Sequence, residues 1–86
     1  MWDSVAFAQA HARKVCLLAL SSGPKMPSAI ASSAGMNLSH VSRALRELEE
    51  KSLVECLTPK MTKNKIYGIT PSGLSVIEKM KMLDKE

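Results

Sequence analysis

The segment from Pro27 to Glu50 constrains the fold more than any other part of the sequence. It holds two stretches whose apolar residues recur at helical spacing, separated only by the short turn "GMN". Pro27 suits the first position of a helix, and Gly35 can adopt the left-handed conformation that ends one. We therefore predict a short helix over 27–34 and a longer one that starts near residue 38 and ends near Lys51.

Each of these two helices is predicted to bury one face. Asn37 or Ser39 can cap the start of the longer helix. Helical spacing places the following residues on buried faces: Ile30, Ala31 and Ala34 in the shorter helix, and Leu38, Val41, Ala44, Leu45 and Leu48 in the longer one.

The exposed face of the longer helix is basic at its start and acidic at its end. Arg43 and Arg46 precede the acidic residues Glu47, Glu49 and Glu50. This order opposes the helix macrodipole, which favours anions at the start and cations at the end. An anionic partner at the start of the helix would explain it. The alternative is a solvated helix with ion pairs between Arg43 and Glu47 and between Arg46 and Glu50.

The flanking segments complete an ordered series of elements. A first helix is expected from Asp3 or Ser4 to about Ser21, and its inner face is expected to hold Val5, Ala8, Ala12, Val15, Cys16 and Ala19. The segment "SSGPKMP" can add a short edge strand. The runs "LVECLT" and "KIYGIT" predict an antiparallel hairpin, and Thr70 and Pro71 are suited to start a last helix. Its apolar side is expected to hold Leu74, Ile77, Met80 and Leu83.

Two short helices joined by a tight glycine turn predict a helix-turn-helix. Ala31 is small where the helices would cross, Gly35 supplies the turn, and Val41 would hold the second helix on the first. The continuation into a hairpin with a lysine-rich loop and then "YGITPSG" makes the pattern more specific. The predicted fold class is α+β and mostly helical: helix, short strand, helix, helix, two-stranded hairpin wing and C-terminal helix.

Over residues 13 to 80 the chain resembles the winged helix-turn-helix family, especially the small MarR-like and ArsR-like transcription regulators. The resemblance rests on "RKVCLLAL", "PSAIASSAGMNLSHVSRALRELEEKSLV" and "YGITPSG". It implies that the third helix reads the major groove of DNA and that the wing touches the backbone or minor groove. Two departures are Ser52, where the family commonly has glycine, and the lack of the long flanking helices by which larger MarR-like proteins dimerise.

The resemblance also places the candidate contacts. The recognition helix would contribute Asn37, Ser39, His40, Ser42, Arg43 and Arg46, and the wing would contribute Lys60, Lys63, Asn64 and Lys65. Lys25 is a further candidate for the DNA backbone, and Ser28 could cap its helix and offer backbone amides to a phosphate. The alternative for the wing lysines is that they only keep an exposed hairpin soluble.

Composition supports one small domain, residues 1–86, with a basic balance. The 86 residues carry a formal charge of +4, which favours anionic partners such as double-stranded DNA. The longest apolar run, Val15 to Leu20, is too short to cross a membrane, so a cytoplasmic protein is expected. Cys16 and Cys56 are expected to remain thiols and to pack with apolar neighbours.

The sequence also limits the classes of function. It contains no phosphate-binding glycine loop, no metal-ligand pair and no nucleophile with a recognisable partner, so no enzyme, metal or cofactor is predicted. A protein interaction module in a larger assembly and RNA binding remain as alternatives. A homodimer is expected, with Trp2, Phe7, Met80 and Leu83 as candidate contact residues. The operator, the regulated genes and any small-molecule effector are not identified by the sequence.

Overall fold

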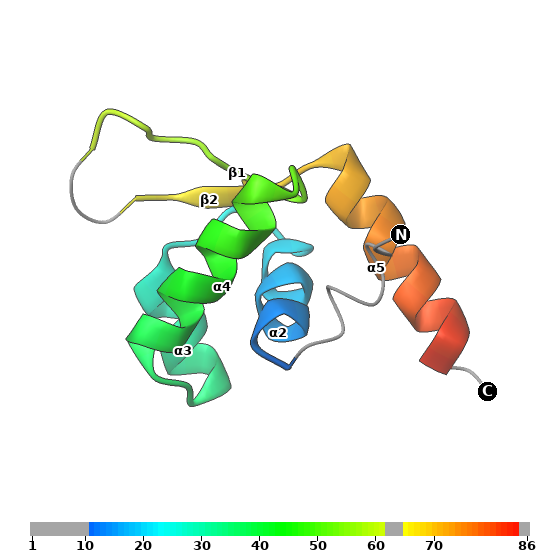
Figure 1. The fold of residues 1–86 in the computed structure, drawn as a ribbon. Coiled ribbons are helices and arrows are strands. Elements are labelled where there is room, and N and C mark those ends of the chain that lie inside the picture. The colour runs from blue at the N-terminus through cyan, green and yellow to red at the C-terminus, as the bar shows by residue number, and fades with distance from the viewer. Residues whose placement is uncertain (1–10, 62–64, 85–86) are drawn as a thin grey trace.

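The computed structural model describes residues 11–61 and 65–84, and its elements follow the predicted order (Figure 1). They are the helices α2 (His11–Leu20), α3 (Pro27–Ala34) and α4 (Leu38–Glu50), the strands β1 (Val54–Cys56) and β2 (Tyr67–Ile69), and the helix α5 (Pro71–Asp84). The predicted fold class is confirmed. The predicted start of the first helix, at Asp3 or Ser4, lies outside the described residues, as do Trp2, Val5, Phe7 and Ala8.

The turn between α3 and α4 forms as the sequence predicts. Gly35 has a φ of 65°, and its N–H donates to the carbonyl oxygen of Ala31, as does the N–H of Met36. Asn37 caps α4, since its side-chain oxygen accepts hydrogen bonds from the N–H and the hydroxyl of Ser39 at 3.0 and 2.8 Å. The angle between the two helices is therefore fixed by local hydrogen bonds as well as by packing.

The expectation that Ser28 caps α3 is wrong. Met26 occupies the capping position and makes no side-chain cap bond, while Pro27 takes the first helical position. Pro27 has a fixed φ and no N–H, so it starts the helix without help from a capping side chain. Ser28 consequently lies inside the first turn, with its side chain exposed.

Each helix from α2 to α5 contributes to one apolar core. The buried residues are Cys16, Leu17 and Leu20 from α2; Ile30 and Ala31 from α3; Val41, Ala44, Leu45 and Leu48 from α4; Leu53 and Val54 around β1; and Val76, Ile77 and Met80 from α5. Of the predicted inner face of α2, Cys16 is buried, and Ala12, Val15 and Ala19 pack against the core while partly exposed. Leu17 and Leu20, which the prediction left off that face, are buried.

Three apolar residues predicted to be buried are exposed. Leu38 is 48% exposed because it lies in the first turn of α4, where the helix borders an open groove. Ala34 is exposed at the end of α3, beside the Gly35 turn. Leu74 is 44% exposed because α5 turns Gly73, Val76 and Ile77 toward the core instead. The side chain of Leu83 lies outside the described part of the chain.

The hairpin is antiparallel and joins the helical layer through one extra bridge. Val54 pairs with Ile69 and Cys56 with Tyr67. Lys25 adds to the other edge of β2, where its N–H and carbonyl bond the carbonyl and N–H of Tyr67 at 3.0 and 2.9 Å. The predicted edge strand is thus reduced to a single bridge, which ties the base of the wing to the residues before α3.

Both cysteines are free thiols, as expected. Cys16 is fully buried, its thiol points to the carbonyl oxygen of Val41 at 4.0 Å, and burial raises its pKa to about 11. It therefore stays protonated at neutral pH and acts as a packing residue. Cys56 is half-buried on β1.

No helix in residues 11–61 and 65–84 combines the length and the apolar character that a membrane crossing requires.

Replacing Ser52 with glycine is expected to stabilise the turn after α4. It adopts a left-handed φ of 61° in the turn after α4, where the family pattern has glycine. Its carbonyl accepts the Thr70 hydroxyl at 2.7 Å, and this backbone acceptor survives the substitution. We expect Ser52→Gly to raise the free energy of unfolding by up to about 1 kcal/mol, measured by urea denaturation.

The matched control is Ser32→Gly, at an exposed position inside α3. Glycine in a helix interior should lower the free energy of unfolding by a few tenths of a kcal/mol. Effects of the same sign at the two positions would contradict a specific role for the left-handed conformation at Ser52.

Candidate nucleic-acid interface

The outer face of α4 presents the predicted polar and basic residues to solvent. Burial of Val41, Ala44, Leu45 and Leu48 fixes the rotation of the helix. The opposite face therefore exposes Ser39, His40, Ser42, Arg43 and Arg46, and Asn37 is exposed just before the helix. The structure thus brings all six predicted recognition residues to one helix and its cap.

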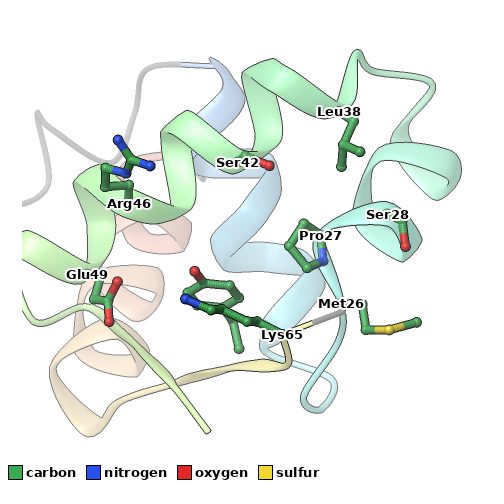
Figure 2. Close-up of a pocket in the computed structure, with 9 residues that line it drawn as sticks. Met26, Pro27, Ser28, Leu38, Ser42, Arg46, Glu49 and Lys65 are labelled. Atoms are coloured by element: carbon green, nitrogen blue, oxygen red, sulfur yellow. The ribbon is translucent and has the colours of Figure 1, made fainter. Parts of the chain in front are cut away.

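An open groove of about 470 Å³ runs beside this face (Figure 2). Ser42, Arg46 and Glu49 lie along its α4 side, while Pro27 and Ser28 border it from the start of α3, and Lys65 lies at the base of the wing. Its other lining residues are Met26, Leu38 and Tyr67. The groove therefore connects three elements for which the sequence predicted DNA contacts separately.

The groove is mainly basic, with one acidic residue. Arg46 and Lys65 bring positive charge, and Glu49 brings one carboxylate. Burial raises the pKa of Tyr67, and the neighbouring Glu49 and Cys56 raise it further, against a smaller lowering by Arg46. The Tyr67 hydroxyl thus keeps its proton at neutral pH and can donate a hydrogen bond.

Neither of the ion pairs considered as an alternative for α4 forms. Glu47 binds Arg13 of α2 instead, with both the Nε and the Nη2 of Arg13 at 2.9 Å from Oε1 of Glu47. Across residues 11–61 and 65–84, neither Arg43 nor Arg46 takes part in an ion pair. Both guanidinium groups are therefore available to a ligand.

The residues predicted for the wing and for the DNA backbone differ in their exposure and in their partners within the protein. Lys60 is exposed and Lys65 half-buried, whereas Lys63 and Asn64 lie outside the described residues. The ammonium group of Lys25 bonds the carbonyl of Ala19 at 3.0 Å and the hydroxyl of Ser22 at 2.8 Å. Lys25 therefore caps the end of α2 and already has two partners within the protein.

Sequence reasoning missed two polar residues of the groove, Glu49 and Tyr67, and one ion pair. Glu49 is one turn from Arg46 on the same face, so helical spacing alone could have placed it there. Tyr67 lines the groove because β2 pairs with Lys25. No local sequence pattern predicts that pairing. The Arg13–Glu47 pair joins helices that are far apart in the sequence and has no sequence signature.

Within the described ranges, no group of three or more histidine, cysteine, aspartate or glutamate side chains could hold a metal ion.

Comparison with known proteins identifies the fold. No protein-family model matches the sequence, and no curated protein matches it. Among solved structures, the chain is similar to one described as a possible transcriptional regulator for arsenical resistance, with 25% identity and a TM-score of 0.74 over 93% of this chain. It is also similar to the MarR family transcription regulator SP03579, with 22% identity and a TM-score of 0.80 over 94% of this chain.

A further similar structure is Mb0332 from Mycobacterium bovis, described as a homodimeric winged helix-turn-helix DNA-binding domain and a possible ArsR-family regulator. Its identity to this chain is 24%, with a TM-score of 0.71 over 93% of this chain. The chain spans 81% of the first of these structures, 55% of the second and 72% of the third. One of the three is described as a transcription regulator and two as possible ones, and they confirm the resemblance to the winged helix-turn-helix family.

Proposed function

We propose that this winged-helix chain binds double-stranded DNA with sequence preference and regulates transcription, with α4 in the major groove and the wing along the backbone. The observation that carries the proposal is the pair Arg43 and Arg46, exposed on α4 and free of ion pairs within the described residues. We further propose that residues 1–86 act as one DNA-binding domain and that a regulator of this kind works in the cytoplasm.

The chemistry of the exposed groups matches that of duplex DNA. An arginine guanidinium can donate two hydrogen bonds to the O6 and N7 atoms of guanine, and serine hydroxyls can bond bases or phosphates. Lys60 and Lys65, with Lys63 and Asn64 of the same loop, would supply phosphate contacts, and Ser28 with the start of α3 would supply another. Lys25 would contribute through its charge, since its ammonium group is already engaged by α2.

We propose a homodimer as the DNA-bound state. One domain makes few base contacts, and two copies would read half-sites about 34 to 36 Å apart. The similar Mb0332 domain is described as homodimeric. Met80 is buried in the core, so the apolar residues that α5 leaves for a partner include Leu74 and Met82.

The test is a salt titration of binding to a random-sequence duplex. Affinity should fall steeply as salt rises, because each phosphate that the protein neutralises releases counterions, and the slope reports how many phosphates are neutralised. The double variant Lys63→Ala with Lys65→Ala should weaken binding and reduce the slope by about 0.9 for each phosphate that is no longer neutralised. The matched control is Lys79→Ala with Lys81→Ala, which removes the same charge from the exposed side of α5.

Two outcomes would count against DNA binding. One is an affinity for the duplex that does not depend on salt, because binding would then neutralise no phosphates. The other is a wing variant that binds like its α5 control. Stronger binding to a single-stranded or double-stranded RNA of the same length would instead favour the RNA alternative.

A further inference from the structure

The ion pair between Arg13 and Glu47 connects α2 to α4. Both donor nitrogens of Arg13 lie 2.9 Å from the same oxygen, Oε1 of Glu47. The two side chains are 25% and 35% exposed, so water screens this pair less than it would a fully exposed one. The contact thus fixes the position of the carboxylate and compensates its charge.

Glu47 has a second potential partner on its own helix. Arg43 precedes it by one helical turn, the spacing at which arginine and glutamate pair on a helix surface. Arg13, Arg43 and Glu47 line the same small cavity, of about 220 Å³, between α2 and α4, together with His40. The carboxylate of Glu47 therefore lies between two elements that each carry an arginine, and Arg13 holds it in the structure.

We infer that Arg13 is a positioning residue for DNA binding: by holding Glu47 it keeps the guanidinium of Arg43 free for the nucleic acid. This inference rests on the proposed function. Without Arg13, the Glu47 carboxylate would lose its partner one turn from Arg43, where it would pair with that guanidinium and repel nearby phosphates. The role is indirect, because Arg13 acts on DNA through two residues of α4.

The experiment compares Arg13→Gln with Lys79→Gln in binding to one duplex. Each variant removes a single positive charge, and Lys79 is an exposed residue of α5, which packs against α2 and β2. We expect Arg13→Gln to lower affinity about two- to fivefold more than Lys79→Gln, the range for a competing surface ion pair. Thermal unfolding of each variant separates this effect from loss of folded protein.

Two double variants distinguish a positioning role of Arg13 from a simple loss of positive charge. Adding Glu47→Gln to Arg13→Gln should restore affinity to the level of Lys79→Gln, because the competing carboxylate is gone. In a protein that already carries Arg43→Ala, Arg13→Gln should have no effect beyond that of Lys79→Gln. Arg13→Lys should retain most of the wild-type affinity, since it keeps a positive charge near the Glu47 carboxylate.

The outcomes separate this inference from the proposed function. If the wild-type protein binds no duplex, the proposed function fails and the inference fails with it. If the wild type binds and Arg13→Gln equals Lys79→Gln, only the inference is overturned. The inference would also be overturned if Arg13→Gln reduced affinity equally in the wild-type protein and in the Arg43→Ala protein. The effect of Arg13 would then not depend on Arg43.

Discussion

Replacing Arg43 and Arg46 together with alanine should reduce affinity for the preferred duplex by about a hundredfold or more, since each bidentate contact to a guanine is worth about 1 to 3 kcal/mol. Fluorescence anisotropy with a labelled duplex would measure the reduction. Both side chains are exposed and neither forms an ion pair within the described residues. The free energy of unfolding should therefore change by less than about 0.5 kcal/mol.

The conservative pair Arg43→Lys and Arg46→Lys serves as the matched control. It keeps both charges but cannot form the planar two-bond contact to guanine. We expect it to bind random duplex almost as well as the wild type while losing preference for the selected sequence. An alanine variant that binds the preferred duplex as tightly as the wild type would show that neither arginine contacts DNA.

The second large effect is on stability, and it concerns Gly73 in the first turn of α5. A Cβ atom added there would lie 2.6 Å from Cγ1 of Ile69 and would overlap the carbonyl oxygen of Leu53. The backbone of Leu53 cannot move freely, because its carbonyl also accepts the N–H of Thr70 at 3.1 Å. Gly73→Ala should therefore lower the free energy of unfolding by about 1 to 3 kcal/mol or more.

Circular dichroism during heating would measure this decrease. For a domain of this size, about 1 kcal/mol corresponds to a fall in Tm of about 4 to 8 °C. Ser75→Ala, two residues later on the exposed side of α5, is the matched control and should change Tm little. A Tm for Gly73→Ala equal to or higher than that of the wild type would mean that Gly73 does not pack closely against Leu53 and Ile69.

The elements that the sequence predicted best are those set by local chemistry. Pro27 and Gly35 mark the two ends of α3, and Asn37 caps α4, because each acts on the backbone within a few residues of itself. The departure at Ser52 was also informative. Serine would be costly there only if the turn needed a left-handed residue, and the observed φ of 61° shows that it does.

The errors concern contacts that depend on the rest of the fold. Leu38 and Leu74 have correct helical spacing but lie where no other element covers them, so periodicity alone could not exclude them from the core. The rotation of α5 follows from Gly73, which admits the Leu53 carbonyl against the helix. The sequence offered Glu47 a partner only within α4, as the alternative to DNA contact by Arg43, whereas packing of α2 against α4 brings Arg13 to it.

The candidate interface was predictable in outline because α4 contributes most of it. One buried stripe fixes the opposite face, so Ser39, Arg43 and Arg46 follow from spacing. The groove that joins α4 to α3 and the wing was not predictable in the same way. It depends on the bridge between Lys25 and Tyr67, which brings the base of the wing beside the start of α3.

The most direct measurement is selection of bound sequences from a random pool of DNA duplexes, with the wild type and with Arg46→Ala in parallel. Reading by α4 in the major groove predicts an enriched motif containing guanine, and two half-sites about one helical turn apart if the protein binds as a homodimer. Arg46→Ala should lose the preference at one base pair of each half-site and keep the rest. No enrichment with the wild type, or an identical motif with Arg46→Ala, would contradict recognition of DNA by this face of α4.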